Sequence, residues 1–314
     1  MQDKQNVQYE ILINPSASFG RGMRVWREVK HILDSHKISY RKHILKAPGV
    51  ATKITASLTG ALSEDRECHI LVLGGYGTLN EVLNGIQDFQ HTVISCLQTG
   101  SGNDFARNAG VQKDAKKAVT ELLDHPMEVS LDYGITYAED RLPRRFLISC
   151  GAGYDADICE EVSRSKLKKV LNCFGLGKLV YVIIGIKQIF TREDSPAKLY
   201  LDDKPPISMN KLFFVVGMQH MCEGGGVPFC PDADPTDGKL DVCLVRDLPK
   251  WKLLLGVTLV YGKKHLLLHN VDCYQCKTLR LVAEKPQQIH LDGETPYKAK
   301  EILWICKGHV RFQK

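Results

Sequence analysis

The stretch of residues 68–85, CHILVLGGYGTLNEVLNG, constrains the fold of this chain more than any other. Residues 68–73 are typical of a strand, and they run into the turn Gly74-Gly75-Tyr76-Gly77. Thr78-Leu79-Asn80-Glu81 has the S/T-x-x-E form of a capping box, so we expect a helix to begin at Thr78. A strand, a glycine turn and a capped helix offer backbone N–H groups to a phosphate. The alternative is an ordinary turn whose glycines serve only its geometry.

Strands and helices alternate through the first third of the chain. The expected strands are residues 9–13, 38–45, 68–73 and 92–97, and the helical segments include 25–33, 50–62, 105–109 and 115–123. Repeated βα units predict a parallel sheet with helices on both faces. Ligands bind such sheets beyond the carboxyl ends of the strands. Three polar or glycine-rich turns fall there, at residues 14–20, 74–78 and 100–104.

From Met127 onward, strands dominate, separated by short turns. They are expected at residues 127–137, 146–150, 197–202, 212–218, 240–246, 278–283 and 288–291, with helical insertions at 155–190 and 249–269. The chain therefore reads as an α/β fold with two domains, an N-terminal parallel-sheet domain (1–130) and a mainly antiparallel β domain (131–300). A strand pair within the last segment, 301–314, is expected to return to the first domain.

Composition and charge limit the partners and the cell compartment that we expect for this chain. The 314 residues carry 42 Lys+Arg and 36 Asp+Glu, and this net charge of +6 suits a protein that meets anionic lipid or phosphate. The basic clusters are short, so we expect solvated faces and no nucleic-acid partner. The N-terminus lacks an apolar signal core, and the longest apolar run, residues 179–186, is far below the ~18 residues of a spanning helix. These features predict a cytoplasmic protein.

Two apolar segments, residues 179–184 and 251–268, have lysines at their borders. We expect both to pack in the core, with contact to a membrane interface as the alternative. The eleven cysteines are scattered, and their odd number favours reduced thiols over a disulfide framework. The single C-x-x-C, Cys273 to Cys276, has no second ligand pair nearby, which disfavours a structural zinc site.

Four further motifs contain residues suited to chemistry. In the turn at 100–104, Ser101 could contact a phosphate, and Asp104 could act through a metal or cap a helix. The sequence GAGYDA at 151–156 fits G-x-G-x-x-A, but its antiparallel surroundings disfavour a dinucleotide site. Asp237 could hold a hard cation together with backbone carbonyls, or lie in a plain turn. Asp292-Gly293 is typical of a hairpin turn, and Glu294 after it could serve as a general base.

These stretches, in this order, resemble the diacylglycerol kinase catalytic family in its soluble bacterial form, within a superfamily that includes sphingosine and ceramide kinases. The matching segments are Asn14-Pro15, GGYGTLNEVLNG from Gly74, GSGNDFAR from Gly100, GAGYDA from Gly151, GGG with PDADPTDGKLDV at 224–242, and DGE at 292–294. The resemblance spans nearly the whole chain. It implies a nucleotide-binding α/β domain and a β-rich domain, with catalysis in the cleft between them.

The resemblance also implies an activity, the transfer of the γ-phosphoryl of ATP to a lipid hydroxyl with magnesium, and a set of roles. The residues that would surround ATP are Asn14, Pro15, Ser16, Ala17, Ser18, Gly74, Gly75, Tyr76, Gly77, Thr78, Leu79, Asn80 and Ser101. Glu294 would accept the proton of the lipid hydroxyl. Asp237, with the backbone carbonyls of Asp234 and Lys239, would hold a structural magnesium. Asp104 and Asp132 would form an acidic network that links the domains.

Two positions depart from the family pattern. Thr236 stands where the family usually has aspartate, and Tyr76 stands where the family reads GGDGT. The missing aspartate at Tyr76 is expected to act beside the magnesium and phosphates, and a neutral phenol with a pKa of about 10 does not replace a carboxylate. A nucleotide- or lipid-binding pseudokinase is therefore a second hypothesis.

An NAD kinase, whose family shares the glycine turn, is a third hypothesis. For the lipid kinase, we expect a lipid alcohol substrate, most directly diacylglycerol, and peripheral contact with a membrane. Both a monomer and a homodimer remain open.

Overall fold

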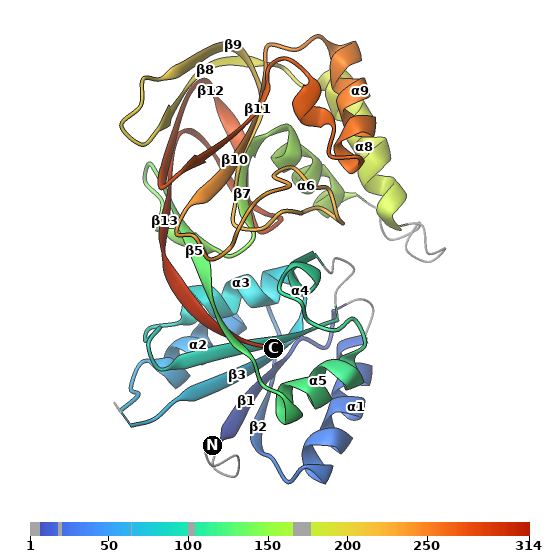
Figure 1. The fold of residues 1–314 in the computed structure, drawn as a ribbon, viewed down its shortest axis with the longest axis vertical. Coiled ribbons are helices and arrows are strands. Elements are labelled where there is room, and N and C mark those ends of the chain that lie inside the picture. The colour runs from blue at the N-terminus through green and yellow to red at the C-terminus, as the bar shows by residue number, and fades with distance from the viewer. Residues whose placement is uncertain (1–6, 18–20, 64, 100–103, 166–176) are drawn as a thin grey trace. The chain divides into compact units, whose positions relative to one another are not determined.

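The computed structural model describes residues 7–17, 21–63, 65–99, 104–165 and 177–314. The chain divides into two compact units, unit 1 (Met1–Leu131 with Gly308–Lys314) and unit 2 (Asp132–Lys307). It leaves unit 1 within strand β5 (Glu128–Ala138) and returns to it within strand β13 (Glu294–Gln313) (Figure 1).

Unit 1 is built on a parallel sheet. Its strands lie in the order β2 (Ser39–Ile44), β1 (Gln8–Ile13), β3 (Cys68–Gly74) and β4 (Thr92–Gln98), and each neighbouring pair is parallel. The end of β13 extends the sheet, because Arg311 and Phe312 pair in parallel with β4. The predicted parallel sheet is confirmed.

Helices cover both faces of this sheet. The helices are α1 (Arg21–Ser35), α2 (Val50–Thr59), α3 (Tyr76–Gly85), α4 (Asp104–Asn108) and α5 (Ala115–Asp124). Helices α1 and α5 share a core cluster with the strands, in which Val29 of α1 lies against side chains such as Ile11 and Leu71. Successive strand residues point to opposite faces, and Leu12 and Val72 are buried as well. Helix α3 packs against β3 and α2.

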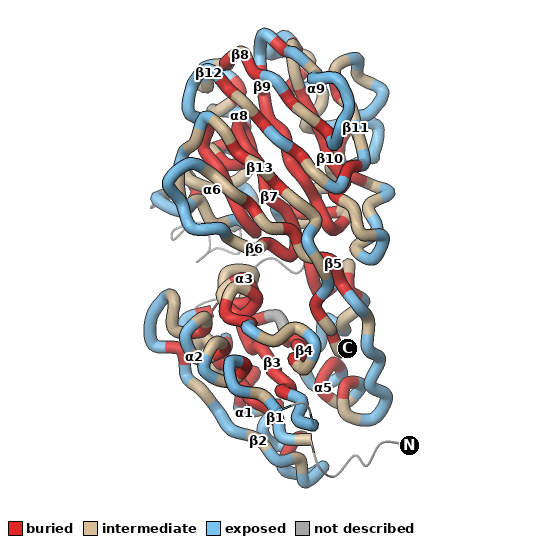
Figure 2. The backbone as a smooth tube through the Cα atoms, turned by 90° about the vertical axis from the view of Figure 1, so that its left-hand side faces the viewer, coloured by how far each residue is buried: buried red, intermediate tan, exposed pale blue. Residues whose placement is uncertain are grey.

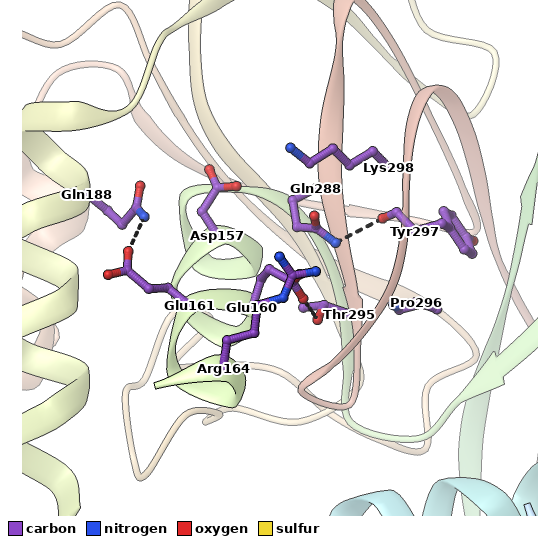
Figure 3. A pocket seen from close by; sticks show the side chains of 10 residues that line it. All are labelled: Asp157, Glu160, Glu161, Arg164, Gln188, Gln288, Thr295, Pro296, Tyr297 and Lys298. Atoms are coloured by element: carbon purple, nitrogen blue, oxygen red, sulfur yellow. Dashed lines mark hydrogen bonds and ion pairs between the residues drawn. The ribbon is translucent and has the colours of Figure 1, made fainter. Parts of the chain in front are cut away.

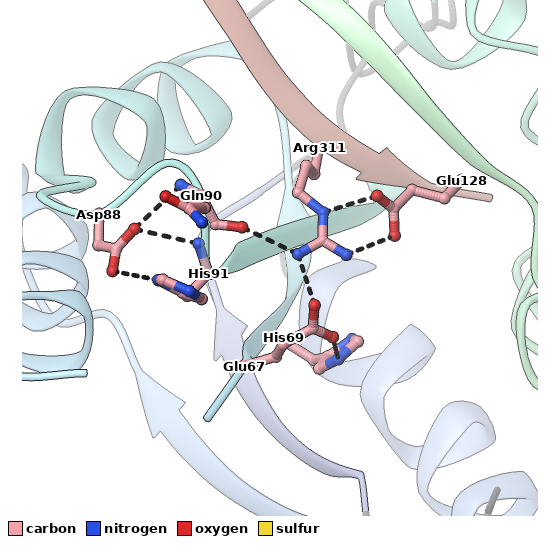
Figure 4. A network of polar contacts seen from close by, with 7 residues as sticks. All are labelled: Glu67, His69, Asp88, Gln90, His91, Glu128 and Arg311. Carbon is pink, nitrogen blue, oxygen red and sulfur yellow. Dashed lines mark hydrogen bonds and ion pairs between the residues drawn. The ribbon is translucent and has the colours of Figure 1, made fainter. Parts of the chain in front are cut away.

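A network around Arg311 fastens the last strand into unit 1 (Figure 4). The Arg311 guanidinium donates to both carboxylate oxygens of Glu128, at 2.6 and 3.0 Å, and to Glu67 at 2.5 Å. It also donates to the Gln90 carbonyl at 3.0 Å. The predicted return of the C-terminus is confirmed, but the predicted strand pair is wrong: β13 is one strand of 20 residues. Gly308 lies inside this strand and does not form a turn.

Unit 2 is an antiparallel β structure. The strand order is β11 (Val271–Cys276), β10 (Leu240–Arg246), β9 (Ile207–Met218), β7 (Ser149–Gly153), β12 (Thr278–Leu291) and β13. Strand β8 (Ser195–Leu201) pairs with β9 and β12, and β6 (Arg144–Phe146) pairs with β5. Figure 2 shows that β7 and β10 are buried along almost their whole length, and the last residues of β9 and β12 are buried as well. Their core includes Trp304, which is fully buried.

The helices of unit 2 are α6 (Tyr154–Arg164), α8 (Gly177–Thr191), α9 (Lys250–Tyr261) and the 3-10 turn η1 (His265–Leu267). They cover a second core cluster in which Phe213 and Phe214 of β9 meet Leu253 of α9. Pro249 occupies the N-cap of α9, one position before the expected first turn. Within the described residues, no helix combines the length and apolar character needed to cross a membrane.

Other strand predictions for unit 2 need correction. The two strands expected at 278–283 and 288–291 are one strand, β12, whose register with β13 shifts between Val282 and Gln287. The strand expected at 146–150 is divided into β6 and β7. Strand β11 was not predicted, because as a half-exposed strand it alternates polar and apolar residues only briefly.

Candidate functional site

The carboxyl ends of β1, β3 and β4 are level with one another. Ile13 pairs with Leu73, and Gly74 pairs with Gln98, so the turns that follow these strands start at the same edge of the sheet. The Thr99 N–H donates to the Gly74 carbonyl at 3.0 Å. The structure thus brings the first two predicted turns together and starts the third beside them. Ser18 and Ser101, which were predicted to contact ATP, lie outside the described residues.

Asn14 ties the first turn to the second. Its N–H donates to the Leu73 carbonyl at 2.9 Å, and its side-chain Nδ2 donates to Thr78 Oγ1 at 2.9 Å. Its Oδ1 accepts the Ser16 N–H at 3.1 Å. The side chain of Asn14 therefore helps to hold the loop in shape.

Helix α3 begins at Tyr76, two residues before the predicted start. Its N-cap is Gly75, which is in an extended conformation and has no side chain of its own to cap the helix. The predicted capping box is wrong, because the Glu81 carboxylate accepts N–H groups of Gly49 and Ala51, at 2.8 and 3.1 Å, and so caps α2. Thr78 packs against Gly74, where a Cβ would lie 2.6 Å from the Thr78 Cβ. Glycine at this position lets the helix start directly at the strand end.

A short acidic turn forms the second part of the candidate site. The fully buried Asp132 accepts the Gly238 N–H at 2.7 Å, and its own N–H donates to the Pro235 carbonyl at 2.7 Å. Asp132 therefore holds both ends of the turn within unit 2. Asp104, its predicted partner, is the first residue of α4, and its side chain lies outside the described residues.

The oxygen donors of this turn fit a hard cation. Asp237 Oδ1 accepts the Lys239 N–H at 2.9 Å, and Asp237 Oδ2 lies 3.4 Å from Gln275 Nε2. Asp234 accepts both the N–H and the hydroxyl of Thr236, at 2.9 and 2.7 Å. Carboxylate and backbone carbonyl oxygens are the kinds of ligand that hard cations take, and magnesium keeps several waters besides. Thr236 thus serves the turn through its hydroxyl, so the loss of an aspartate there is mild.

Asp292 and Glu294 have different roles although only Gly293 separates them. Asp292 and Gly293 have φ of 47° and 84°, as in the two-residue hairpin turn that the sequence predicts. The buried Asp292 carboxylate accepts the N–H groups of Leu147, Ile148 and Ser149, so it is a structural acceptor. Glu294, with its side chain 44% exposed, lies 3.3 Å from Arg144. A half-exposed carboxylate beside an arginine can be oriented and still reach a substrate.

Comparison with known families accounts for both units. Residues 8–132 match the diacylglycerol kinase catalytic domain, and residues 148–301 match the YegS C-terminal NAD kinase beta sandwich-like domain. The chain belongs to the diacylglycerol kinase catalytic family. It is therefore an enzyme of the lipid kinase type.

Individual relatives cover most of the chain. YtlR of Bacillus subtilis (strain 168) is 25% identical over 293 residues, which span 91% of this chain and 94% of that protein. The diacylglycerol kinase of Staphylococcus carnosus (strain TM300) is 26% identical over 251 residues, 80% and 77% of the two chains. A crystal structure of a diacylglycerol kinase from Bacillus anthracis str. Sterne covers 99% of this chain and 97% of its own, with a TM-score of 0.68 at 17% identity. This last likeness shows the fold alone.

One polar cluster of this lipid kinase was not predicted from the sequence. His290 Nε2 lies 2.8 Å from Asp155 Oδ2 and 3.8 Å from Glu223 Oε1, and the three side chains are buried. Ser149 donates its hydroxyl to Glu223. Burial raises the pKa of Glu223 to about 7. Burial also opposes charge on His290, but the neighbouring carboxylates of Glu223 and Asp155 raise its pKa to about 9. An imidazolium between two carboxylates forms an internal ion pair, and its members come from α6, β12 and the loop between β9 and β10.

A polar pocket of about 460 Å³ lies in unit 2 (Figure 3). Its lining comes from α6, α8, β12 and β13: Asp157, Glu160, Glu161, Arg164, Gln188, Gln288, Thr295, Pro296, Tyr297 and Lys298. Gln188 donates to Glu161 at 2.7 Å, and Gln288 donates to the Tyr297 carbonyl at 3.1 Å. Thr295 directly follows Glu294 in β13, so the pocket adjoins the predicted base along the chain. The sequence carries no spacing that announces this pocket.

Proposed function

We propose that this protein is an ATP-dependent lipid kinase that transfers the γ-phosphoryl group to the hydroxyl of diacylglycerol and so forms phosphatidic acid. The observation that carries the proposal is the start of α3, where a helix with glycine as its N-cap residue begins at the carboxyl edge of a parallel sheet. Such a helix N-terminus attracts phosphate through its backbone N–H groups and its dipole. Family membership supplies the lipid kinase class.

The nucleotide site comes from unit 1 in this proposal. The backbone around Asn14, Pro15, Ser16 and Ala17 and the turn from Gly74 to Asn80 would surround ATP, with Ser18 and Ser101 as the remaining contacts. The Asn14 to Thr78 hydrogen bond keeps the first two segments in register. Phosphoryl transfer needs positioning and charge neutralisation more than covalent chemistry from the protein, and a backbone cradle supplies positioning.

The base comes from unit 2. Glu294 would accept the proton of the lipid hydroxyl as the oxygen attacks the γ-phosphorus, while Arg144 holds the carboxylate in place. Asp237, with the carbonyls of Asp234 and Lys239, would hold magnesium, which neutralises local carboxylate charge and stiffens the turn. Asp132 keeps that turn closed through Gly238.

The decisive experiment is a lipid panel with labelled ATP and magnesium, run on the native protein, Glu294→Gln and the matched control Glu284→Gln, an exposed acid on β12. We expect diacylglycerol to be labelled and Glu294→Gln to lower kcat by about 100- to 10,000-fold, the usual contribution of a general base. The control should retain native turnover. Labelling of NAD with no labelling of any lipid alcohol would overturn the proposal in favour of an NAD kinase.

A second candidate, a pseudokinase that binds nucleotide or lipid without turnover, is favoured by one residue. Tyr76 is the first residue of α3, where the family pattern has aspartate. If the pseudokinase is correct, the native protein binds ATP but only Tyr76→Asp transfers phosphate. Comparable turnover by both proteins would eliminate it.

Contact with a membrane would bring the lipid within reach, and α8 and α9 are suited to it. The prediction that residues 179–184 are core is only partly right: Val180 and Ile184 are buried, but Leu179, Val182 and Ile183 are exposed. Further exposed apolar side chains on these helices are Ile186, Phe190, Trp251 and Leu255. Lys250 of α9 donates to the Phe190 carbonyl at 2.6 Å, so the two helices present their apolar side chains close together.

We therefore propose peripheral binding through α8 and α9, with nearby lysines favouring anionic lipid. Co-sedimentation with vesicles of phosphatidylcholine and phosphatidylglycerol tests this, with Trp251→Ser and Ile183→Ser as the variants. Both should weaken binding, whereas Met127→Ser, an exposed apolar residue of unit 1, should leave it unchanged. Equal sedimentation of all four proteins would contradict the proposal.

A further inference from the structure

Three cysteines that are far apart in the sequence meet beside the edge strand of unit 2. Cys243 of β10 pairs directly with Cys273 of β11 in the antiparallel ladder, so their side chains lie on the same face. The Cys273 Sγ lies 3.5 Å from the carbonyl oxygen of Phe229, the residue before Cys230. Cys230 and Cys243 are buried, and Cys273 is exposed. The group therefore has one accessible thiol and two covered ones.

The two cysteines of the C-x-x-C pattern do not lie side by side in the fold. Cys273 and Cys276 are three residues apart in one strand, so they point to opposite faces of the sheet. Cys276 packs in the core cluster with Trp304, whereas Cys230 and Cys243 belong to the cluster under α9. The partners of Cys273 are therefore Cys230 and Cys243.

The surroundings of Cys273 favour its thiolate. Hydrogen bonds from the thiols of Cys230 and Cys243 lower the pKa of Cys273 to about 4, against the opposing effect of burial. The neighbouring His265 adds to the lowering, and its Nε2 lies 3.0 Å from the Phe229 carbonyl, which fixes the ring beside the thiols. Burial raises the pKa of Cys230, so this thiol keeps its proton. A stabilised thiolate at the surface beside protonated thiols is the arrangement of a redox-active site.

We propose that Cys273 is a hydroperoxide-reactive thiol and that Cys230 resolves its oxidised form into a disulfide. In the first step the Cys273 sulfur attacks a peroxide oxygen, an S–O bond forms, the O–O bond breaks, and the leaving oxygen takes a proton. In the second step the Cys230 sulfur attacks the Cys273 sulfur and loses its proton, an S–S bond forms, and hydroxide leaves as water. With hydrogen peroxide, two thiols and one peroxide give one disulfide and two waters.

Cys230 is assigned as the resolving residue because it lies on a loop. A bridge from Cys230 joins this loop to the sheet and leaves the ladder intact, whereas a bridge from Cys243 would join two directly paired strand residues. A disulfide needs specific Cα and Cβ geometry, to which a loop residue can adjust more readily than a residue fixed in a strand pair. The bridge would also anchor the loop four residues before Asp234, at the start of the acidic turn.

The test uses the full chain and does not depend on kinase turnover. Iodoacetamide alkylation followed by mass spectrometry should modify Cys273 at a rate that changes less than about twofold between pH 6 and 9, since its thiolate is fully formed throughout. The half-buried Cys306, whose pKa is raised by burial, should react about tenfold faster for each pH unit. A Cys273 rate that climbs in parallel with that of Cys306 would overturn the proposal.

Peroxide treatment tests the resolving residue. Stoichiometric hydrogen peroxide should give a peptide that joins Cys230 to Cys273, which dithiothreitol reverses. In Cys230→Ser the oxidised Cys273 should persist and be trapped by dimedone, and in Cys243→Ser the disulfide should still form. A Cys243–Cys273 bridge in the native protein, or no dimedone adduct in a folded Cys230→Ser, would overturn the assignment.

Discussion

Two turns in this protein share a sequence pattern but differ in the side chains around the helix that follows. In each, a buried strand ends in glycines and a helix follows: Gly74-Gly75 precedes α3 in unit 1, and Gly151-Ala152-Gly153 precedes α6 in unit 2. At α3 the N-cap residue is Gly75, which has no side chain of its own. At α6 the Asp155 carboxylate turns back to accept the Ala156 N–H at 2.8 Å and pairs with His290.

The difference lies in what occupies the helix N-terminus. The protein's own acid and its histidine partner fill the start of α6, so no external phosphate is needed there. A Cβ on Gly151 would lie 2.1 Å from Asp155 Oδ2 and 2.4 Å from His290 Nε2, which shows how tightly this space is filled. Glycines leave space at the start of the helix that follows a turn. The surrounding side chains determine whether a ligand or the protein itself fills that space.

The largest effect expected from this comparison is on the stability of the α6 turn. Gly153 has φ of 110°, and a Cβ there would lie 2.6 Å from the Phe213 carbonyl oxygen and 3.0 Å from the Phe214 Cα. We expect Gly153→Ala to cost about 3 kcal/mol of unfolding free energy or more, measured by urea unfolding.

The matched change in the α3 turn should act on ATP instead. Gly75 has φ of −104° and ψ of −168°, which any residue adopts, so Gly75→Ala should change stability by less than about 1 kcal/mol. It should raise the KM for ATP about tenfold, because a methyl group keeps phosphate from the backbone. If instead Gly75→Ala unfolds the protein and Gly153→Ala is tolerated, the comparison is wrong.

The second effect is a pH dependence that belongs to the α6 turn. The folded pKa of His290 is about 9, above the ordinary value of about 6.5, so its protonation stabilises the fold fully below pH 6.5 and less as pH rises through 9. We expect urea unfolding of the native protein to lose on the order of 3 kcal/mol between pH 6.5 and 9. His290→Gln should be less stable at pH 6.5 and should lose less stability across this window, and the remaining loss comes from Glu223, whose raised pKa also lowers stability as pH rises. Parallel pH profiles for the two proteins would exclude the ion pair as the cause.

The smallest effect concerns the hydrogen bond that shapes the α3 turn. Thr78→Val removes the acceptor of the Asn14 side chain and keeps the shape, and we expect a loss of about 1 kcal/mol in stability. The KM for ATP should rise severalfold, while Thr78→Ser, which retains the hydroxyl, should match the native protein in both measurements. Native-like behaviour of Thr78→Val would show that Asn14 does not position this loop.

The sequence predicted the parallel sheet, the β-rich second half and the family, because local periodicity and ordered motifs carry that information. The hairpin turn at Asp292-Gly293 was also predictable, since few residue pairs adopt two positive φ angles. The helix start at Thr78 was mispredicted for a definite reason. A capping box is a local pattern, but the Glu81 side chain finds its N–H partners at the start of α2, about 30 residues earlier.

The sequence by itself determined which turns carry glycine, which strands are apolar and where acids such as Asp237 and Glu294 occur. Only the tertiary structure decided which of these groups meet. The fold placed Asp155, Glu223 and His290 together, and strand register set Cys273 beside Cys243 instead of Cys276. The physical reason is that contacts between distant residues follow from sheet register and from the alternation of strand faces, and one stretch of sequence specifies neither.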